Sequence, residues 1–538
     1  MALLFSVLLF IGSLFFFVYE SEHAETQDTY ESGALKGEVH EARKLQKRLA
    51  KTLDGTSVQL CFKGELLACD RESLTFYLPV DMETDAWEAG TFADQSGEFG
   101  ILPLEDYTRL EKKETVSSGY AVPFLAWNEK EGTCTTIYVV FTGLPVVRME
   151  TDASLDVDTV FAGSVEFYEN CGKEDWTLKS VFQAHERGQT TRAYPKKGYR
   201  VDLISVTSTG VINKNKEKVL GMRKSDSWIF YAIYSDGTKV RDQFNTRIWD
   251  RLGAWDTPYD TRFGTSMKYV ELVVNGEYRG LYGIFEPIDS TQLEISDQEY
   301  LYKRTYGREL LAETMDSVAP SEYLTVLGME LKGRNGQGNG EDWKCFRTFV
   351  EMCQSDDETF RAEAEKLLNM DNVADIWLYL QMMYAEDNIY KNMFFAFKKE
   401  SDGYRMYLVP WDTDLTWGNT YVDDGEQLYV QWSPEYAQDY LEWPFLDRLL
   451  KLDVGNIREK VAARWQKLRQ DELSDENLKN MLDDCIHEVQ DSGAFARDAA
   501  RWPDSRHDGD YEGMESYLKT RIAWLDKTMK NMDEQIEK

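Results

Sequence analysis

The order of apolar and polar residues divides the chain into segments of different kinds. Residues 2–18 are apolar except for Ser6, Gly12 and Ser13, and as a helix they would span about 26 Å, close to the hydrocarbon thickness of a bilayer. From 54 to 147, short runs of β-branched and aromatic residues alternate with turn residues, a pattern typical of strands. We therefore predict an N-terminal membrane helix followed by a small all-β, sandwich-like module.

Further along the chain, strands and helices mix. The strongest hairpin signal joins residues 269–274 and 278–285 through Asn275-Gly276, because Asn-Gly supplies the positive φ angles of a type I′ turn. Residues 371–384 place their apolar side chains on one helical face, and Asp371 is the predicted N-cap.

The remaining segments follow the same reasoning. Residues 393–397 and 406–409 predict a second hairpin that turns at Asp402-Gly403. The chain from 456 to 538 has helical composition, interrupted at Arg501-Trp502-Pro503.

Polar residues cluster at the two outer ends of the second hairpin. Asp387 and Asn392 precede its first strand, and Asp412 and Asp414 follow its second. Because an antiparallel hairpin brings its outer ends together, these four side chains should converge. The spacing from Asp387 to Asn392 is also that of the D-x-x-x-x-N catalytic loop of protein kinases, in which an Asp acts on the acceptor hydroxyl and an Asn and a later Asp hold magnesium.

Composition narrows the classes of partner. Among 538 residues, 95 are acidic and 61 are Lys or Arg, which gives a net charge of −34; nucleic acid is therefore not the expected partner. The seven cysteines form no C-x-x-C pair, and with only five His they offer no zinc spacing. A disulfide between Cys61 and Cys69 remains open.

The residues after the apolar segment bear on location. Glu20, Glu22 and Glu25 follow it and the first Lys is Lys36, so the positive-inside rule places the bulk of the chain outside the cytoplasm. The sequence favours an uncleaved membrane anchor, since it has no small-x-small cleavage site. The alternative is a signal peptide, with secretion if residues 1–24 are cleaved.

Several motifs occur together in a recognisable order. They are Arg187-Gly188-Gln189-Thr190-Thr191-Arg192, Pro195-Lys196-Lys197-Gly198-Tyr199-Arg200, Ser235-Asp236-Gly237-Thr238-Lys239-Val240-Arg241-Asp242, the hairpin Asn275 to Gly283 with Glu286, and Pro410-Trp411-Asp412-Thr413-Asp414. In this order the chain resembles the CotH (spore coat protein H) kinase family over roughly residues 140–530. The resemblance implies a compact, atypical bacterial protein kinase that uses ATP and Mg²⁺ (or Mn²⁺) to phosphorylate Ser or Thr hydroxyls of exported or surface proteins.

The resemblance also implies roles for individual residues. Asp387 matches the catalytic Asp, and Asn392, Asp412 and Asp414 match the metal-binding positions. The implied nucleotide-binding residues are Arg192, Lys196, Lys197, Arg200, Glu286, Tyr404 and Met406, the last at a position where the family often has an aromatic residue that stacks on adenine.

Together, these observations predict an α+β protein in five parts. They are a signal anchor or signal peptide at 1–19, a linker with a short helix at 20–53, the β-rich module at 54–147, a CotH-like kinase core at 148–453, and a C-terminal helical region at 454–538 packed on the core. Two other functions stay open. One is a non-catalytic surface or adhesion protein with the same fold, and the other is a metal-dependent glycosyltransferase in which Asp412-Thr413-Asp414 is the D-x-D motif.

Overall fold

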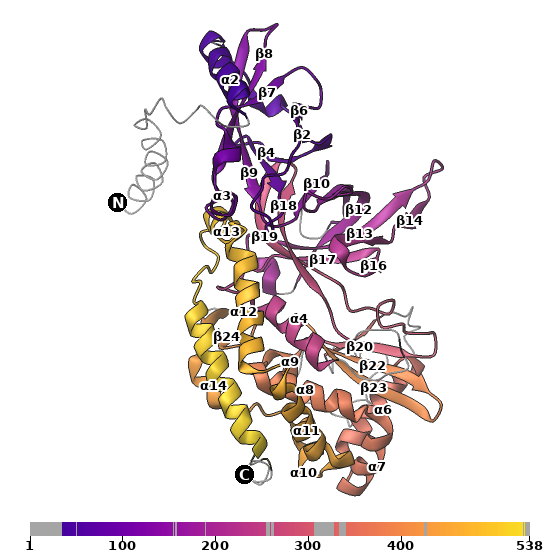
Figure 1. Ribbon diagram of the computed structural model, residues 1–538. Coiled ribbons are helices and arrows are strands. Elements are labelled where there is room, and N and C mark those ends of the chain that lie inside the picture. Colours follow the sequence, from indigo (N-terminus) through magenta and orange to yellow (C-terminus); the bar gives the residue numbers. More distant parts are fainter. Residues whose placement is uncertain are drawn as a thin grey trace.

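A computed structural model describes residues 35–530 and Met532, except for 50, 154, 156–158, 189, 254–258, 260–262, 306–327, 333–339 and 424–427. The predicted membrane segment at 1–19 lies outside these residues. Within them, no helix combines the length and the apolar character needed to cross a bilayer. The chain has a mixed α+β fold, with β-rich units at one end and a helical lobe at the other (Figure 1).

The N-terminal unit is built on two sheets. One has the strand order β4-β5-β9-β8-β7, with β1 beside β9, and the other is β3-β2-β6. Their bounds are β1 Lys51–Thr52, β2 Leu60–Phe62, β3 Glu65–Leu66, β4 Ala68–Asp70, β5 Thr75–Pro79, β6 Phe92–Asp94, β7 Gly100–Pro103, β8 Ala121–Asn128 and β9 Thr133–Thr142. Two helices, α2 (Lys36–Arg48) and α3 (Lys112–Ser117), belong to the same unit.

The next unit is a closed barrel, which the sequence did not reveal. Its strands pair in the order β12-β11-β10-β18-β19-β17-β13, and β13 pairs back with β12. The bounds are β10 Val146–Glu150, β11 Phe161–Tyr168, β12 Thr177–Arg187, β13 Gly198–Val206, β17 Ser227–Tyr231, β18 Met267–Val274 and β19 Glu277–Phe285. A short strand, β14 (Ile212–Lys214), extends β13 beyond the barrel. Closure leaves the barrel strands without free edges, and its interior is filled by apolar side chains.

The N-terminal unit shares its apolar core with the barrel. Val273 and Tyr278 of the barrel belong to the same buried cluster as the N-terminal strands. The ring of Tyr278 stacks on that of Tyr77, with centroids 4.8 Å apart. The N-terminal β unit therefore stabilises the barrel wall by direct packing.

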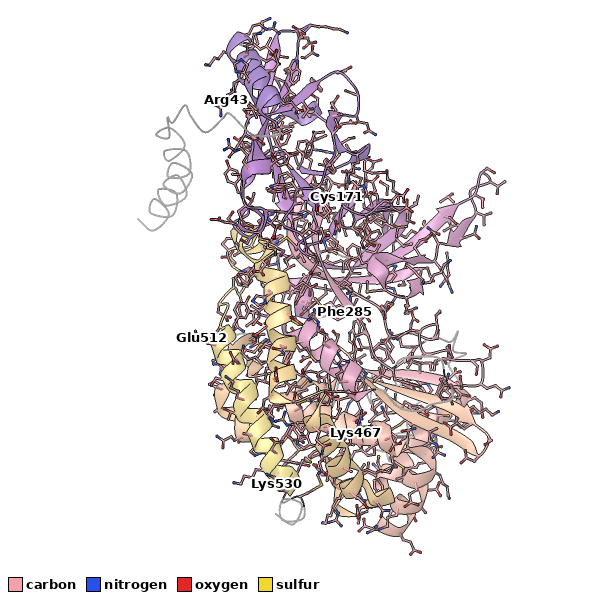
Figure 2. The ribbon with its side chains drawn as sticks, viewed as in Figure 1. Arg43, Cys171, Phe285, Lys467, Glu512 and Lys530 are labelled. Atoms are coloured by element: carbon pink, nitrogen blue, oxygen red, sulfur yellow. The ribbon has the colours of Figure 1, made fainter. Side chains whose placement is uncertain are left out.

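The lower lobe combines one antiparallel sheet with helices. The sheet order is β21-β20-β22-β23, with β20 Tyr300–Arg304, β21 Met329–Lys332, β22 Met393–Glu400 and β23 Gly403–Pro410. The helices of this lobe are α4 Arg241–Leu252, α6 Lys344–Gln354, α7 Asp357–Leu367, α8 Met370–Met383, α9 Asp387–Tyr390, α10 Pro444–Lys451, α11 Ile457–Gln470, α12 Asp475–Gln490, α13 Ala494–Arg501 and α14 Tyr511–Lys530. Phe285 lies where barrel and lobe meet (Figure 2) and packs on Tyr231 and Trp411.

Helix α12 runs along the lobe to the barrel, where α13 lies, and α14 returns along the lobe (Figure 1). The carboxylate of Asp498 on α13 is fully buried and lies 2.6 Å from the ammonium of Lys196. The same carboxylate accepts hydrogen bonds from the backbone N–H of Leu281 at 2.9 Å and from the His507 ring at 2.8 Å. One charged group thus joins the tail to two places on the barrel.

The local predictions are largely confirmed. Asn275 and Gly276 have φ angles of 53° and 73° and join β18 to β19, and β22 and β23 form the second predicted hairpin. The predicted N-cap was wrong. Asn369, not Asp371, caps α8, because its side chain accepts a hydrogen bond from the backbone N–H of Asn372, whereas Asp371 pairs with Lys460.

The disulfide left open between Cys61 and Cys69 does not form. All seven cysteines are free. Cys61 lies on β2 and Cys69 on β4, which belong to different sheets.

Removal of the Asp498 carboxylate should destabilise the fold severely. Because Asp498→Ala leaves the ammonium of Lys196 buried without its counter-charge, we expect the free energy of unfolding in urea to fall by about 3–5 kcal/mol. Asp483→Ala is the control, since Asp483 pairs with Lys479 on the surface and such pairs contribute about 0–1 kcal/mol. Equal effects of the two substitutions would contradict this role for Asp498.

Candidate functional site

A cavity of about 600 Å³ lies between the barrel and the lower lobe. Strands β12, β13 and β17 line it from the barrel side, and α9, β22 and the segment after β23 line it from the lobe side. All four residues predicted to act in catalysis or metal binding line this cavity: Asp387, Asn392, Asp412 and Asp414. The hairpin argument therefore located these four residues correctly.

The ends of the hairpin β22–β23 hold the first three residues in place. The side-chain amide of Asn392 donates to Asp387 at 2.7 Å, and the backbone N–H of Trp411 donates to the Asn392 carbonyl at 3.0 Å. Asn388 donates to the carbonyl oxygens of Asn392 and Trp411 at 3.1 and 2.8 Å. This network joins the loop before β22 to the loop after β23, and it fixes Asp387 relative to Asp412.

Helix α4 holds the loop that contains Asp412 and Asp414. Asp242 accepts a hydrogen bond from the backbone N–H of Thr413 at 3.0 Å, and Asn245 donates to the Thr413 carbonyl at 2.8 Å. Arg241 donates to the carbonyl of Thr416 at 3.0 Å. The motif that ends in Arg241-Asp242 therefore acts as a support for the acidic loop.

Burial and crowding of like charges raise the pKa values of the acids. Burial, assisted by the charge of Asp412, raises the pKa of Asp414 to about 7, while Ser235 and Tyr231 donate hydrogen bonds to Asp414 at 2.7 and 3.0 Å. Burial also raises the pKa of Asp387 to about 6, against the opposing charge of Lys391. The pKa of Asp242 is raised by burial and by Asp414 and Asp412. A cation bound here would relieve this repulsion.

Five further cationic side chains, to which no role was assigned from the sequence, also line the cavity: Arg187, Lys214, Lys303, Lys332 and Lys391. Burial lowers the pKa of Lys303 to about 8, and the charge of Asp412 opposes that shift. Lys391 lies 3.4 Å from Asp387. The available signal for Lys303 was a lysine that directly follows the apolar run Tyr300-Leu301-Tyr302 within β20.

Of the seven residues predicted to bind nucleotide, two line the cavity. Arg200 lines it, and so does Lys196. The Lys196 ammonium, however, is fully buried and donates to Asp498 at 2.6 Å and to the Leu281 carbonyl at 2.5 Å. Lys196 therefore has a structural partner and is not available to a phosphate.

The other five predicted nucleotide-binding residues do not line the cavity: Arg192, Lys197, Glu286, Tyr404 and Met406. Lys197 is paired with Glu186 at 3.1 Å. Glu286 accepts a hydrogen bond from the backbone N–H of Arg223, and the Tyr404 hydroxyl donates to the Gln298 carbonyl.

Met406 is buried in the core of the lobe, where its carbonyl accepts a hydrogen bond from the backbone of Asn369. It does not lie where it could stack on a base in the cavity.

A family model described as CotH kinase protein matches residues 184–525, which is more than half of the chain. The chain belongs to the CotH kinase family. The match starts within β12 and ends in α14, so it includes the cavity and the acidic loops and leaves out the N-terminal β unit. No curated protein matches the chain.

Membership of a kinase family raises the question of a divalent metal. Among the described residues, no three His, Cys, Asp or Glu side chains are arranged to hold a metal ion by themselves. Mg²⁺, however, is usually held by one or two carboxylates together with substrate phosphates and water. Asp412, Asp414 and the amide oxygen of Asn392 supply suitable oxygen ligands in one cavity, so this CotH-family site fits the ion when nucleotide provides the remaining ligands.

The raised pKa of Asp414 predicts how stability depends on pH in metal-free protein. A carboxyl whose pKa is 3.8 when unfolded and about 7 when folded binds protons more tightly in the folded state, so stability falls as pH rises from about 4 to about 7. We expect unfolding by urea in EDTA to show a loss of up to about 4 kcal/mol from this group between pH 4 and pH 8.

Asp414→Asn should remove most of that loss, because the amide does not titrate. Asp371→Asn, on the exposed side of α8, is the control and should leave the pH dependence unchanged. An unchanged pH dependence in Asp414→Asn would contradict the assignment.

Proposed function

We propose that this CotH-family protein is a protein kinase that transfers the γ-phosphoryl group of ATP to Ser or Thr hydroxyls of exported or surface proteins. The observation that carries the proposal is the convergence of Asp387, Asn392 and Asp412 from the two ends of one hairpin onto a cavity lined with cations. Phosphoryl transfer needs acids that position the acceptor and a metal, and cations that neutralise the phosphates.

In the proposed reaction the Asp387 carboxylate accepts the proton of the acceptor hydroxyl. The hydroxyl oxygen then bonds to the γ-phosphorus, while the bond from that phosphorus to the β–γ bridging oxygen breaks and ADP leaves. Lys391, 3.4 Å from Asp387, opposes the rise of the Asp387 pKa, which is about 6, so the carboxyl is mostly ionised at neutral pH and can accept the proton. Mg²⁺, when bound, would neutralise charge on the phosphates.

Arg187 and Lys303 are the proposed phosphate-binding cations. Both line the cavity, and the charge of Asp412 acts on both side chains. These two residues replace Lys196 and Lys197 in the role that the sequence suggested, because those lysines are paired with Asp498 and Glu186.

The location of the protein is also a proposal. We propose that the apolar N-terminal segment either anchors the chain in a membrane or is cleaved as a signal peptide. Either route would place the kinase and its acceptor proteins outside the cytoplasm.

Substitution of the acids should abolish transfer without unfolding the protein. For Asp387→Asn and Asp412→Asn we expect kcat with ATP, Mg²⁺ and casein to fall by at least about 100-fold. Asp402→Asn, at the exposed turn of the same hairpin, is the control and should retain activity. A wild-type protein that neither binds nor consumes ATP would overturn the proposal and would favour the non-catalytic surface protein.

Lys303 should contribute mainly to nucleotide affinity. Loss of one charge-assisted contact weakens binding by about 1.5–3 kcal/mol, so Lys303→Met should raise the Kd for ATP–Mg²⁺ by at least about tenfold in a thermal-shift titration. Lys399→Met is the matched control on β22, since Lys399 is exposed and donates to Gln298. Equal Kd values for the two variants would contradict this role.

A further inference from the structure

The outer face of the barrel beside the cavity carries an exposed row of aliphatic side chains. Val181, Val206 and Ile212 have exposed fractions of 41%, 53% and 52%, although most of the aliphatic residues that the structure describes are buried. Together with the buried Ile204 they form what we call the apolar row. Strand β14, which carries Ile212, pairs with β13 on one side and with no other described strand.

Strand register places the apolar row on the same face as part of the cavity lining. His185 is opposite Arg200, which is opposite Ile229, and all three line the cavity. Successive side chains of a strand alternate between faces, so residues two apart on one strand and residues directly opposite on neighbouring strands share a face. Ile204 is four residues from Arg200 on β13 and therefore shares its face.

The pairing of β13 with β12 and β14 shows which further side chains share the face of Arg200. Ile204 is opposite Val181 on β12 and Lys214 on β14. Val206 is opposite Ile212. The face therefore runs without interruption from the cavity to the free tip of the β13–β14 ribbon, which projects from the molecule at the right of Figure 1.

The length of this face suits a peptide. Arg200 and Val206 are six residues apart on β13, a distance of about 20 Å at about 3.3 Å per residue. An extended segment with its hydroxyl in the cavity would reach the apolar row about five to seven residues away. The free edge of β14 offers backbone groups for strand addition, a recurring mode of peptide recognition.

Charge around the ribbon differs from that of the whole protein. Residues 204–224 contain five Lys or Arg and one acid, a net charge of +4, in a chain whose net charge is −34. Lys214, Lys216, Lys218 and Lys224 are exposed. Lys214 pairs with Asp226 at 2.9 Å, and Arg200 pairs with Asp202 at 3.4 Å, so Lys216, Lys218 and Lys224 contribute most of the positive charge offered to a docked segment. This surface is complementary to an acidic segment and repels a basic one.

We propose that the outer face of β12, β13 and β14 docks an extended, acidic segment of the acceptor protein, with aliphatic side chains on the apolar row and acidic ones near the lysines. The inference rests on the proposed function, since it names the substrate class of the same site. It predicts specificity for acceptors that carry aliphatic residues five to seven positions from the phosphorylated Ser or Thr.

Binding of three synthetic peptides tests the proposal without ATP. The first has a central Ser, Glu on both sides, and Val at five and seven positions from the Ser; the second replaces every Glu by Lys; the third replaces every Val by Ser. By fluorescence anisotropy, wild-type protein should bind the first peptide at least about tenfold more tightly than the other two. Tenfold corresponds to about 1.4 kcal/mol.

Substitutions in the β13–β14 ribbon test whether the peptide binds at this surface. Val206→Ser with Ile212→Ser, and separately Lys216→Glu with Lys218→Glu, should each weaken binding of the first peptide about tenfold. Tyr138→Ser, an exposed strand position in the N-terminal unit, and Lys44→Glu, on the exposed side of α2, should leave binding unchanged. Equal affinity of wild type and ribbon variants, or no preference for the first peptide, would overturn the proposal.

Activity measurements separate this inference from the proposed function. If transfer occurs, the ribbon variants should raise the KM for the first peptide and leave kcat and the thermal shift with ATP–Mg²⁺ unchanged. A Glu-Ser-Glu peptide, too short to reach the apolar row, should be insensitive to the same variants. If ATP is neither bound nor consumed, the proposed function fails, while peptide binding still decides whether the face docks acidic segments.

Discussion

The buried carboxylate of Asp498 is the interaction on which the arrangement of the molecule depends. Burial alone would raise its pKa, but Lys196, His507 and Lys239 hold the pKa at about 2, so the group is ionised near neutral pH. An ionised group in the interior is tolerated only when its partners are all in place. The backbone at Leu281 approaches so closely that a Cβ at Gly280 would lie 2.1 Å from the carboxylate. Helix α13 is therefore part of the kinase fold, consistent with a family match that extends to residue 525.

Carboxylates are also buried together at the cavity. Asp242, Asp387, Asp412 and Asp414 lie close together, and burial, followed by repulsion among these carboxylates, raises the pKa values of Asp242, Asp387 and Asp414. Hydrogen bonds from α4 and from the hairpin β22–β23 keep the acids together against it. At Asp498 the protein supplies the counter-charges itself. At the cavity, Lys391 lies 3.4 Å from Asp387, and under the proposed function a bound cation, Arg187 and Lys303 would supply the remaining counter-charge.

Short-range features were predictable from sequence, and long-range ones were not. The turn at Asn275-Gly276 is predictable because two adjacent residues determine its backbone conformation. The convergence of Asp387 and Asp412 is predictable because an antiparallel hairpin brings its two outer ends together. Closure of the barrel depends on pairing of β12 with β13 while both also pair elsewhere, and no local pattern encodes that. Lys196 was assigned to nucleotide because its partner Asp498 lies 302 residues away. Lys303 was missed because its strand pairs with segments distant in sequence. Motif spacing thus predicted that the acids converge on one cavity, but it did not predict which cations lie there, because their availability depends on tertiary partners.

The net charge of −34 repels an acidic acceptor at long range, but salt screens this repulsion over short distances. At physiological ionic strength the Debye length is about 8 Å, so acids on the far sides of the helical lobe and the N-terminal unit are largely screened at the ribbon. A docked segment would therefore respond to the charges within contact distance, which are the lysines of residues 204–224 and Arg200 together with the acids Asp202 and Asp226 that pair with Arg200 and Lys214. The wider negative field would slow association, and the local cations would slow dissociation. A surface of this kind favours specificity over rapid encounter, because only a segment that reaches both the apolar row and the lysines gains enough contact to remain bound.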